Sequence, residues 1–302
     1  MCSSKCPVQS YKPYLERVKF LVRLPDDKKL HNLVLIGTHS SLSYLINDEE
    51  SQTQDLNIAQ QLKYGIRVLD LGVRPKSNLF KISSESTPTD IDFSDALSNI
   101  DNFLDTNPGE FIIMFIRQVY PMDIDVTKSN CEILNHYISN SAGGKRLVKN
   151  WRLNDTIGHH RGKILLATWG EAFGECTFYL KRKCLIQNDD LTYRSKNRVY
   201  NLQDKWSRIS KLLRNSYIKY SQCLINDISF SDGLNSRRAI AKDGGYFLNN
   251  SCAIPLNHAM STNFLYSYLA LNIIMADFVT QELIDEMNDS NFLTSDWRSG
   301  WH

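Results

Sequence analysis

The sequence predicts an α/β protein built as a single (β/α)8 barrel of the TIM type. Short apolar runs alternate with helical patterns along almost the whole chain, and eight of these runs read as strands. Strands that alternate with helices pair in parallel through right-handed crossovers, and a strand count near eight favours a closed barrel over an open sheet. The 302 residues suffice for one such barrel, and no linker or internal repeat marks a second domain.

The predicted elements follow one another with short connections. The candidate strands are residues 33–36, 66–73, 79–82, 111–116, 163–168, 184–187, 223–228 and 273–278. Apolar residues at helical spacing predict helices at 14–22, 58–65, 93–104, 133–137, 202–217 and 264–271. We therefore expect an N-terminal helical cap over residues 1–30, the barrel over residues 31–290 and a C-terminal tail over residues 291–302.

Composition places the chain among folded globular proteins. Hydrophobic residues make up 42% and charged residues 23% of the sequence. The net charge of +2 gives no reason to expect a nucleic-acid partner. No apolar run reaches the roughly 18 residues of a membrane span, and the N-terminus lacks the apolar core of a signal peptide. The cytoplasm is therefore the expected location, and the sequence carries no signal for oligomeric state.

The cysteines and glycosylation motifs leave other locations open. Seven cysteines stand at positions 2, 6, 131, 176, 184, 223 and 252. Their odd number and scattered spacing predict neither a zinc site nor a disulfide framework, so we expect mostly reduced thiols. Acylation of Cys2 and Cys6 would favour peripheral membrane contact, and the sequons at Asn154, Asn249 and Asn288 leave secretion possible.

A histidine and two aspartates follow predicted strands at the point where each strand ends. His39 comes after the first strand and Asp277 ends the last one, and closure of a barrel places these two carboxyl ends side by side. A carboxylate that orients a histidine and stabilises its protonated form is what general-base catalysis requires. Asp70, near the end of the second strand, would lie on the other flank. The alternatives are a solvated loop histidine and helix-capping aspartates.

Five stretches carry motifs in the order of a known family. They are Ile36–Ser41, Gln61–Leu71, Phe103–Met114, Arg161–Leu166 and Ile273–Val279. Together they resemble the X domain of phosphatidylinositol-specific phospholipase C, from about residue 30 to 290, and the chain looks closest to the small single-domain members. The resemblance implies a barrel of the phosphatidylinositol phospholipase C type that cleaves phosphodiesters at its carboxyl rim.

The resemblance also implies roles for particular residues. In this family one histidine takes the proton from the inositol 2-hydroxyl, which attacks phosphorus, and a second histidine protonates the departing oxygen. His39 matches the first histidine, Asp277 its aspartate partner and Asp70 the acidic residue of the second strand. Candidate substrate-binding residues are Arg74, Lys81, Arg117, Asp189 and Tyr193. The expected ligand is a phosphoinositide or glycerophosphodiester headgroup.

The position that meets the charge on phosphorus departs from the family pattern. Family members have an arginine or a calcium-binding carboxylate two residues beyond Asp70, whereas this chain has Gly72. Calcium is therefore not expected, and we predict no metal or other cofactor. Arg74 lies two residues farther along, on the same face if the strand continues, and is a candidate substitute. Its alternative role is that of a solvated turn residue.

The second histidine is also missing. No histidine occurs between His39 and His136, although Lys81 or Glu85 would lie near the vacant position. We therefore expect a phosphoric diester hydrolase family member with weak or absent activity. The alternative is a pseudoenzyme that binds phosphoinositide headgroups, a membrane surface or a protein partner. A purely structural role is the third possibility and has no positive sign in the sequence.

Overall fold

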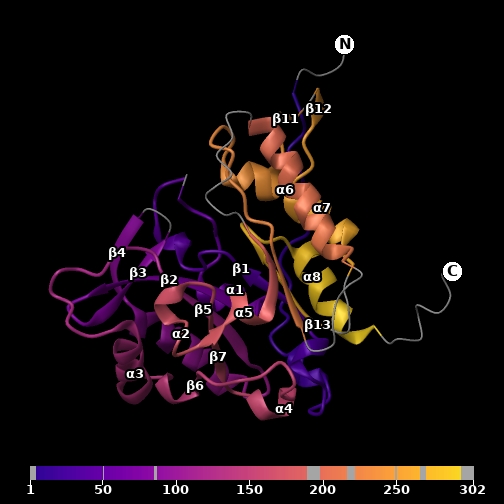
Figure 1. Ribbon diagram of the computed structural model, residues 1–302. Coiled ribbons are helices and arrows are strands. Elements are labelled where there is room, and N and C mark those ends of the chain that lie inside the picture. Colours follow the sequence, from indigo (N-terminus) through magenta and orange to yellow (C-terminus); the bar gives the residue numbers. More distant parts are fainter. Residues whose placement is uncertain are drawn as a thin grey trace.

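A curled, mostly parallel sheet surrounded by helices forms the centre of the protein (Figure 1). The computed structural model describes residues 5–49, 51–84, 87–188, 198–215, 222–248, 250–265 and 270–293. The strand order along the sheet is β6-β7-β5-β2-β1-β13-β10-β9, and its ends among the described residues are β9 on one side and β6 with β8 on the other. This arrangement confirms the predicted α/β, TIM-like fold.

The main strands and helices follow the predicted alternation. The strands are β1 Val34–Thr38, β2 Val68–Lys76, β3 Leu79–Ser84, β4 Thr87–Asp92, β5 Ile112–Gln118, β6 Leu147–Val148, β7 Ile164–Thr168, β8 Phe178–Tyr179, β9 Cys184–Gln187, β10 Gln222–Asp227, β11 Phe247–Leu248, β12 Ser251–Cys252 and β13 Ala270–Ala276. The helices are α1 Ile58–Lys63, α2 Phe93–Thr106, α3 Asn130–Asn140, α4 Ile157–His160, α5 Leu180–Lys183, α6 Arg198–Leu213, α7 Leu256–Asn263 and α8 Gln281–Asp289, with short 3-10 turns between them.

Strands β1 and β13 are neighbours, as the barrel prediction requires. They pair in parallel from Val34 opposite Asn272 to Thr38 opposite Ala276, and β1 pairs with β2 on its other side. Every residue of β1 and of β13 is buried. Burial on both faces explains why these strands read as continuous apolar runs rather than alternating patterns. The carboxyl ends of the first and last strands therefore lie side by side.

Alternate residues of each strand belong to two different buried clusters. One cluster includes residues of the surrounding helices together with Ile36, Met114, Leu166 and Ile274. The other contains the intervening strand residues Leu35, Val68, Ile113, Phe115, Leu165, Ile225, Ile273 and Met275. Successive strand side chains point to opposite faces, so the second cluster fills the barrel interior. Leu21, Leu24 and Trp151 close it at one end.

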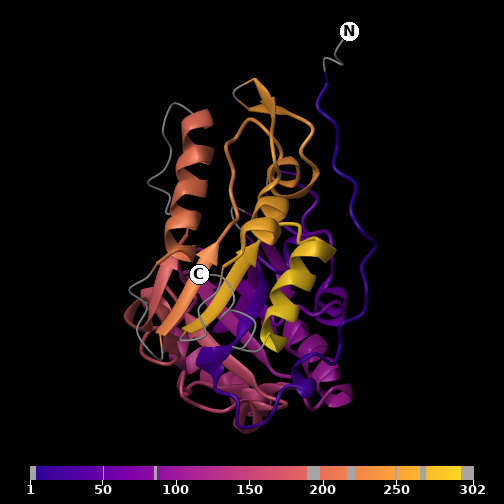
Figure 2. The same ribbon diagram turned by 90° about the vertical axis from the view of Figure 1, so that its right-hand side faces the viewer.

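The N-terminal segment forms no helix over residues 14–20, so the prediction there was wrong. A 3-10 turn, η1 Leu21–Arg23, is the first element with helical geometry among the described residues. The preceding segment runs along one side of the molecule (Figure 2). Its backbone amides are bound by α8 side chains: Lys12 N–H donates to Glu282 and Leu15 N–H to Gln281. These external partners take the place of intrahelical hydrogen bonds.

The third predicted strand is real but is not a parallel barrel strand. β3 pairs antiparallel with β2 through a turn at Ser77 and Asn78, whose φ angles are 50° and 59°. Two successive positive φ angles are the geometry of a tight hairpin. The helix predicted at 264–271 is absent at both of its ends, because Phe264 is extended after α7 ends at Asn263, and β13 begins at Ala270. Its middle, residues 266–269, lies outside the described residues.

Six of the seven cysteines are paired, which corrects the expectation of reduced thiols. The disulfides are Cys6–Cys252, Cys131–Cys176 and Cys184–Cys223. Their partners are 246, 45 and 39 residues apart in sequence, so only the fold brings them together. For example, Cys184 and Cys223 are cross-strand neighbours on β9 and β10. Cys2 lies outside the described residues.

Within the described part of the chain, no helix has both the length and the apolar character needed to cross a membrane.

Candidate active site

Four of the predicted site residues share one face of the sheet. His39, Asp70, Arg117 and Asp277 each follow an interior-facing strand residue by an even number of positions. His39 and Asp277 directly follow β1 and β13, Arg117 is the last residue but one of β5, and Asp70 lies in β2 opposite Phe115 of β5. The two-residue period of a strand therefore directs all four side chains toward the mouth of the barrel. Polar groups in this position are where barrel enzymes place their chemistry.

His39 and Asp277 form the predicted pair. The distance from His39 Nδ1 to Asp277 Oδ1 is 2.9 Å. The Asp277 side chain is fully buried, whereas 13% of the His39 side chain is exposed. A carboxylate accepts a hydrogen bond from a protonated ring nitrogen, so the pairing assigns a proton to Nδ1 and makes Nε2 the basic nitrogen of the neutral ring. The other nitrogen, Nε2, is then able to accept a proton.

The backbone around His39 is fixed by neighbours from both sides. Its N–H donates to Ala276 O at the end of β13. Its carbonyl oxygen accepts from Thr53 Oγ1 at 2.8 Å and from Gln54 Nε2 at 2.9 Å. The next residue, Ser40, has a φ of 44°, a conformation uncommon for residues other than glycine. These contacts hold the imidazole in one orientation.

Asp70 and Arg117 form a second pair beside the first. Arg117 Nε donates to both carboxylate oxygens of Asp70, at 2.9 and 3.1 Å. Its Nη2 donates to Ser40 Oγ at 2.6 Å, and Ser40 N–H donates to Asp70 Oδ2 at 3.0 Å. Asp70 is fully buried and Arg117 is 19% exposed. A guanidinium therefore lies next to the residue that follows His39.

The surroundings of Gly72 leave no space for a functional side chain. A Cβ at this position would collide with the carbonyl oxygen of Ser83 and lie 2.5 Å from Val119 Cγ2. Gly72 lies opposite Arg117 in the β2–β5 ladder, so an arginine is present at this level on the neighbouring strand. With the Asp70 oxygens directed at Arg117, the residues here do not fit a calcium ion, which requires several free oxygen ligands. Among the described residues, no group of three histidine, cysteine or acidic side chains is arranged for a metal.

Arg74 and Lys81 are not brought into this group. Strand β2 does continue through Arg74, which is the cross-strand partner of Lys81 in the hairpin. Their ion pairs, however, are with Asp123 at 4.0 Å and with Asp92 at 3.5 Å. The remaining predicted positions, Asp189, Tyr193 and Glu85, lie outside the described residues.

The sequence interpretation did not single out Ser40 or Arg237. Ser40 lies within the first motif and was identifiable as the neighbour of His39. Arg237 follows β10 in a long loop, and its Nη1 is 3.5 Å from Asp277 Oδ2. Nothing in the sequence connects that loop to the end of β13, because the contact depends on the path of the loop.

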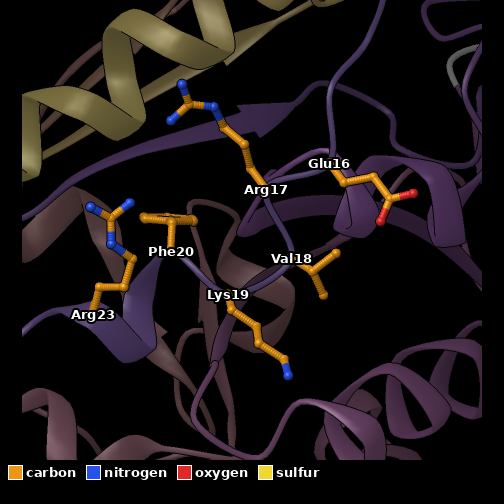
Figure 3. A pocket seen from close by; sticks show the side chains of 6 residues that line it. All are labelled: Glu16, Arg17, Val18, Lys19, Phe20 and Arg23. Atoms are coloured by element: carbon orange, nitrogen blue, oxygen red, sulfur yellow. The ribbon is translucent and has the colours of Figure 1, made fainter.

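A pocket beside the N-terminal segment is a second candidate site (Figure 3). It is lined by Glu16, Arg17, Val18, Lys19, Phe20 and Arg23. Arg17 is engaged by Asp285 and Asp289 of α8. Figure 3 shows the charged ends of Arg17 and Lys19 pointing in different directions. These side chains do not converge on a common point, so the barrel mouth is the better candidate.

Comparison with known proteins points to one family. Residues 35–168 match the family described as phosphatidylinositol-specific phospholipase C, X domain. The chain is 27% identical over 153 residues to 1-phosphatidylinositol phosphodiesterase of Staphylococcus aureus, which is 49% of each chain. It is 34% identical over 105 residues to the corresponding protein of Listeria monocytogenes, covering 33% of this chain and 32% of that one. The matches thus span about half or less of these relatives.

Solved structures extend the similarity of fold to nearly the whole chain. A phosphatidylinositol-specific phospholipase C from S. aureus superimposes with a TM-score of 0.69 at 19% identity, covering 92% of this chain and 98% of the other. The enzyme from L. monocytogenes gives a TM-score of 0.63 at 20% identity, covering 91% of this chain and 99% of the other. At this low identity the matches establish the barrel fold alone.

Proposed function

We propose that this chain is a weak phosphodiesterase with His39 as its base. The chain belongs to the phosphatidylinositol-specific phospholipase C family through the X domain at residues 35–168. The observation that carries the proposal is the 2.9 Å contact between His39 Nδ1 and Asp277 Oδ1 at the mouth of the barrel. The substrate class is a phosphoinositide or glycerophosphodiester with a hydroxyl next to the phosphodiester, as the names of the relatives suggest.

The proposed reaction is an intramolecular displacement at phosphorus. His39 Nε2 takes the proton of the neighbouring hydroxyl, whose oxygen forms a bond to phosphorus. The bond from phosphorus to the glycerol oxygen breaks, which yields a cyclic phosphate and an alkoxide that takes a proton from water. Asp277 stabilises the imidazolium that forms on His39. A positioned acid contributes about 10²–10⁴ in rate, so the missing second histidine accounts for weak activity.

Arg117 is proposed to replace the charge-stabilising group missing at position 72. Its guanidinium is held by Asp70 and by Ser40 Oγ, and part of its side chain is exposed. We expect Arg117→Met to lower kcat/KM by about 10²–10³ because one electrostatic stabiliser is lost. Steady-state kinetics on folded protein measures this.

The control for Arg117→Met must separate lost stabilisation of the transition state from an unpaired Asp70. The double variant Arg117→Met/Asp70→Asn removes both charges. It should recover thermal stability but not activity. Unchanged kcat/KM in Arg117→Met would contradict the role of Arg117, and recovery of activity in the double variant would assign the loss to the unpaired carboxylate.

Calcium is proposed to play no part in this activity. The argument rests on the ion pair of Asp70 with Arg117 and on the lack of space at Gly72. We expect the rate of cyclic phosphate release to be the same after treatment with a chelator and after addition of excess calcium. A loss of activity on chelation that calcium alone restores would overturn this proposal.

A pseudoenzyme that binds phosphoinositide headgroups, a membrane surface or a protein partner is the alternative, favoured by the missing acid and by Gly72. Release of inositol cyclic phosphate from phosphatidylinositol vesicles by the wild type and by His39→Ala decides between the two. A rate that depends on His39 supports the enzyme. Equal background rates in both proteins, together with co-sedimentation of the wild type with the vesicles, support a binding module instead.

The setting that we propose is a lipid surface in an oxidising compartment. Three disulfides are typical of exported proteins and rare in the cytosol, so they favour the open alternative of secretion over the expected cytoplasm. Membrane binding is named for a structurally similar S. aureus phospholipase. Peripheral contact with phosphoinositide-containing membranes would bring the barrel mouth to its substrate.

A further inference from the structure

A third charged residue contacts the histidine–aspartate pair from a loop. Asp277 Oδ1 is paired with His39, whereas its other oxygen, Oδ2, has no hydrogen-bond partner among the described residues. The nearest cation that faces Oδ2 is the Arg237 guanidinium, with Nη1 at 3.5 Å. A buried carboxylate is costly unless its charge is compensated. Arg237 supplies compensation at the carboxylate oxygen that His39 does not contact.

The loop that carries Arg237 is anchored on both sides of this residue. Ser236 Oγ accepts from Ala239 N–H, and Ser236 O accepts from Ile240 N–H at the start of the π-helix η7 Ala239–Asp243. Arg238 bridges Asp55 and Asp243 at 2.7 and 3.0 Å. The residues on both sides of Arg237 are therefore fixed, and this holds the Arg237 side chain beside the Asp277 carboxylate.

The target of Arg237 is equally constrained. Asn257 Nδ2 donates to the carbonyl oxygens of Asp277 and Phe278, at 3.0 and 2.9 Å. The Arg238 guanidinium lies 5.4 Å from the centre of the Phe278 ring. The segment after β13 and the loop after β10 are thus joined around the Asp277 carboxylate, although Arg237 and Asp277 are 40 positions apart in the sequence.

We propose that Arg237 is a positioning residue that holds Asp277 for His39 and limits how strongly this carboxylate draws a proton onto the imidazole. The inference rests on the proposed function of His39 as a base. A positive charge on the far side of the carboxylate offsets part of its attraction for an imidazolium. His39 then stays neutral, and able to accept a proton, at a lower pH than with Asp277 alone.

Other charges near the pair act in the same field and must stay constant in a test. The carboxylates are Asp70 of β2, Asp55 before α1 and Asp243 of η7, and the cations are Arg117 of β5, Arg238 of the loop and Lys242 of η7. Asp70 pairs with Arg117. Asp55 pairs with Arg238 and Lys242, and Arg238 also pairs with Asp243. Among the described residues, Arg237 is the arginine that pairs with Asp277 Oδ2, and its removal leaves both neighbouring groups of ion pairs in place.

The test is the titration of His39 in the wild type, Arg237→Gln and Arg237→Lys. The glutamine variant keeps most of the length and a donor but loses the charge, whereas the lysine variant keeps the charge. We expect Arg237→Gln to raise the His39 titration midpoint, followed by NMR of the ring protons, by about half to one pH unit. The acid limb of the kcat/KM profile should move to higher pH by the same amount. Arg237→Lys should shift both by less.

An exposed arginine provides the matched control. Arg152→Gln removes the same charge from the loop before α4, where Arg152 is exposed, and should leave the His39 midpoint unchanged. If Arg237→Gln also leaves it unchanged, the proposal is overturned. The NMR titration does not depend on turnover. A wild type without activity would contradict the proposed function, and the effect of Arg237 on the His39 midpoint could still be measured. If the glutamine variant does not fold, a His39 midpoint in Arg237→Met that equals that of the wild type overturns the proposal equally.

Discussion

We expect His39→Ala to release cyclic phosphate about 10²–10⁴-fold more slowly than the wild type, because a positioned base contributes this much to proton transfer. Asp277 holds the imidazole, and the side chains of Thr53 and Gln54 hold the backbone of His39 by donating to its carbonyl oxygen. A water molecule in place of the His39 side chain would not be held in this position as a base. The measurement is initial-rate release from phosphatidylinositol vesicles, with the fold of each variant checked by thermal melting.

The pair should behave as one unit in a double-mutant comparison. Asp277→Asn should slow the reaction because the amide can neither stabilise imidazolium nor select the productive tautomer. The double variant His39→Ala/Asp277→Asn should be no slower than His39→Ala, since groups that act together are not additive. His159→Ala, at an exposed position of α4, is the matched histidine control and should keep the wild-type rate. A double variant that is much slower than His39→Ala would assign Asp277 an independent role.

The part of this site that the sequence predicts is the part carried by strands. A buried strand fixes which residues face the interior through its two-residue period, so His39 and Asp277 meet once β1 and β13 pair. The proximity of Asp70 follows from the same rule on β2. Arg117 was named as a candidate for substrate binding, but its ion pair with Asp70 depends on the register of β2 and β5.

What the sequence could not predict depends on paths through space rather than on periodicity. Arg237 reaches Asp277 from a loop, and the cysteine pairs join elements that are distant in the chain. The prediction of an N-terminal helix was wrong for a related reason: the apolar residues of this segment are spaced to pack against the rest of the protein. Tyr14 stacks on Tyr64 with 4.9 Å between the ring centres, and its hydroxyl donates to Val279 O. The hairpin at Ser77 and Asn78 could have been predicted from the sequence, because two short polar residues between strands are typical of a tight turn.

A buried ion pair at the start of β2 organises the end of the barrel opposite the site. Arg67 Nε donates to Glu110 Oε2 at 2.9 Å, and both side chains are at most 1% exposed. Arg67 also donates to the carbonyl oxygens of Leu62, at 2.8 Å, and of Val18, at 2.6 Å. Glu110 accepts from Val22 N–H at 2.9 Å. The pair therefore joins α1, β2 and the N-terminal segment.

Removing one partner of this pair should strongly destabilise the fold. Burial lowers the pKa of Arg67, which shows the cost of taking its charge out of water, and Glu110 is what offsets that cost. We expect Arg67→Met to lower the free energy of unfolding by about 3–5 kcal/mol, because an unpaired carboxylate is left in the interior. Arg67→Lys should not rescue stability, since an ammonium cannot reproduce the guanidinium contacts. Urea denaturation of the oxidised protein measures each value.

The double variant Arg67→Met/Glu110→Gln distinguishes the charge from the packing. With neither charge present, its loss of stability should be smaller than the sum of the two single losses, because each single variant includes the same penalty for an unpaired buried ion. Lys63→Met, which breaks the exposed pair with Glu16, should change stability little and serves as the matched control. Additive losses in the double variant would instead mean that the contacts of Arg67 with Leu62 and Val18, rather than its charge pairing, hold this end of the barrel together.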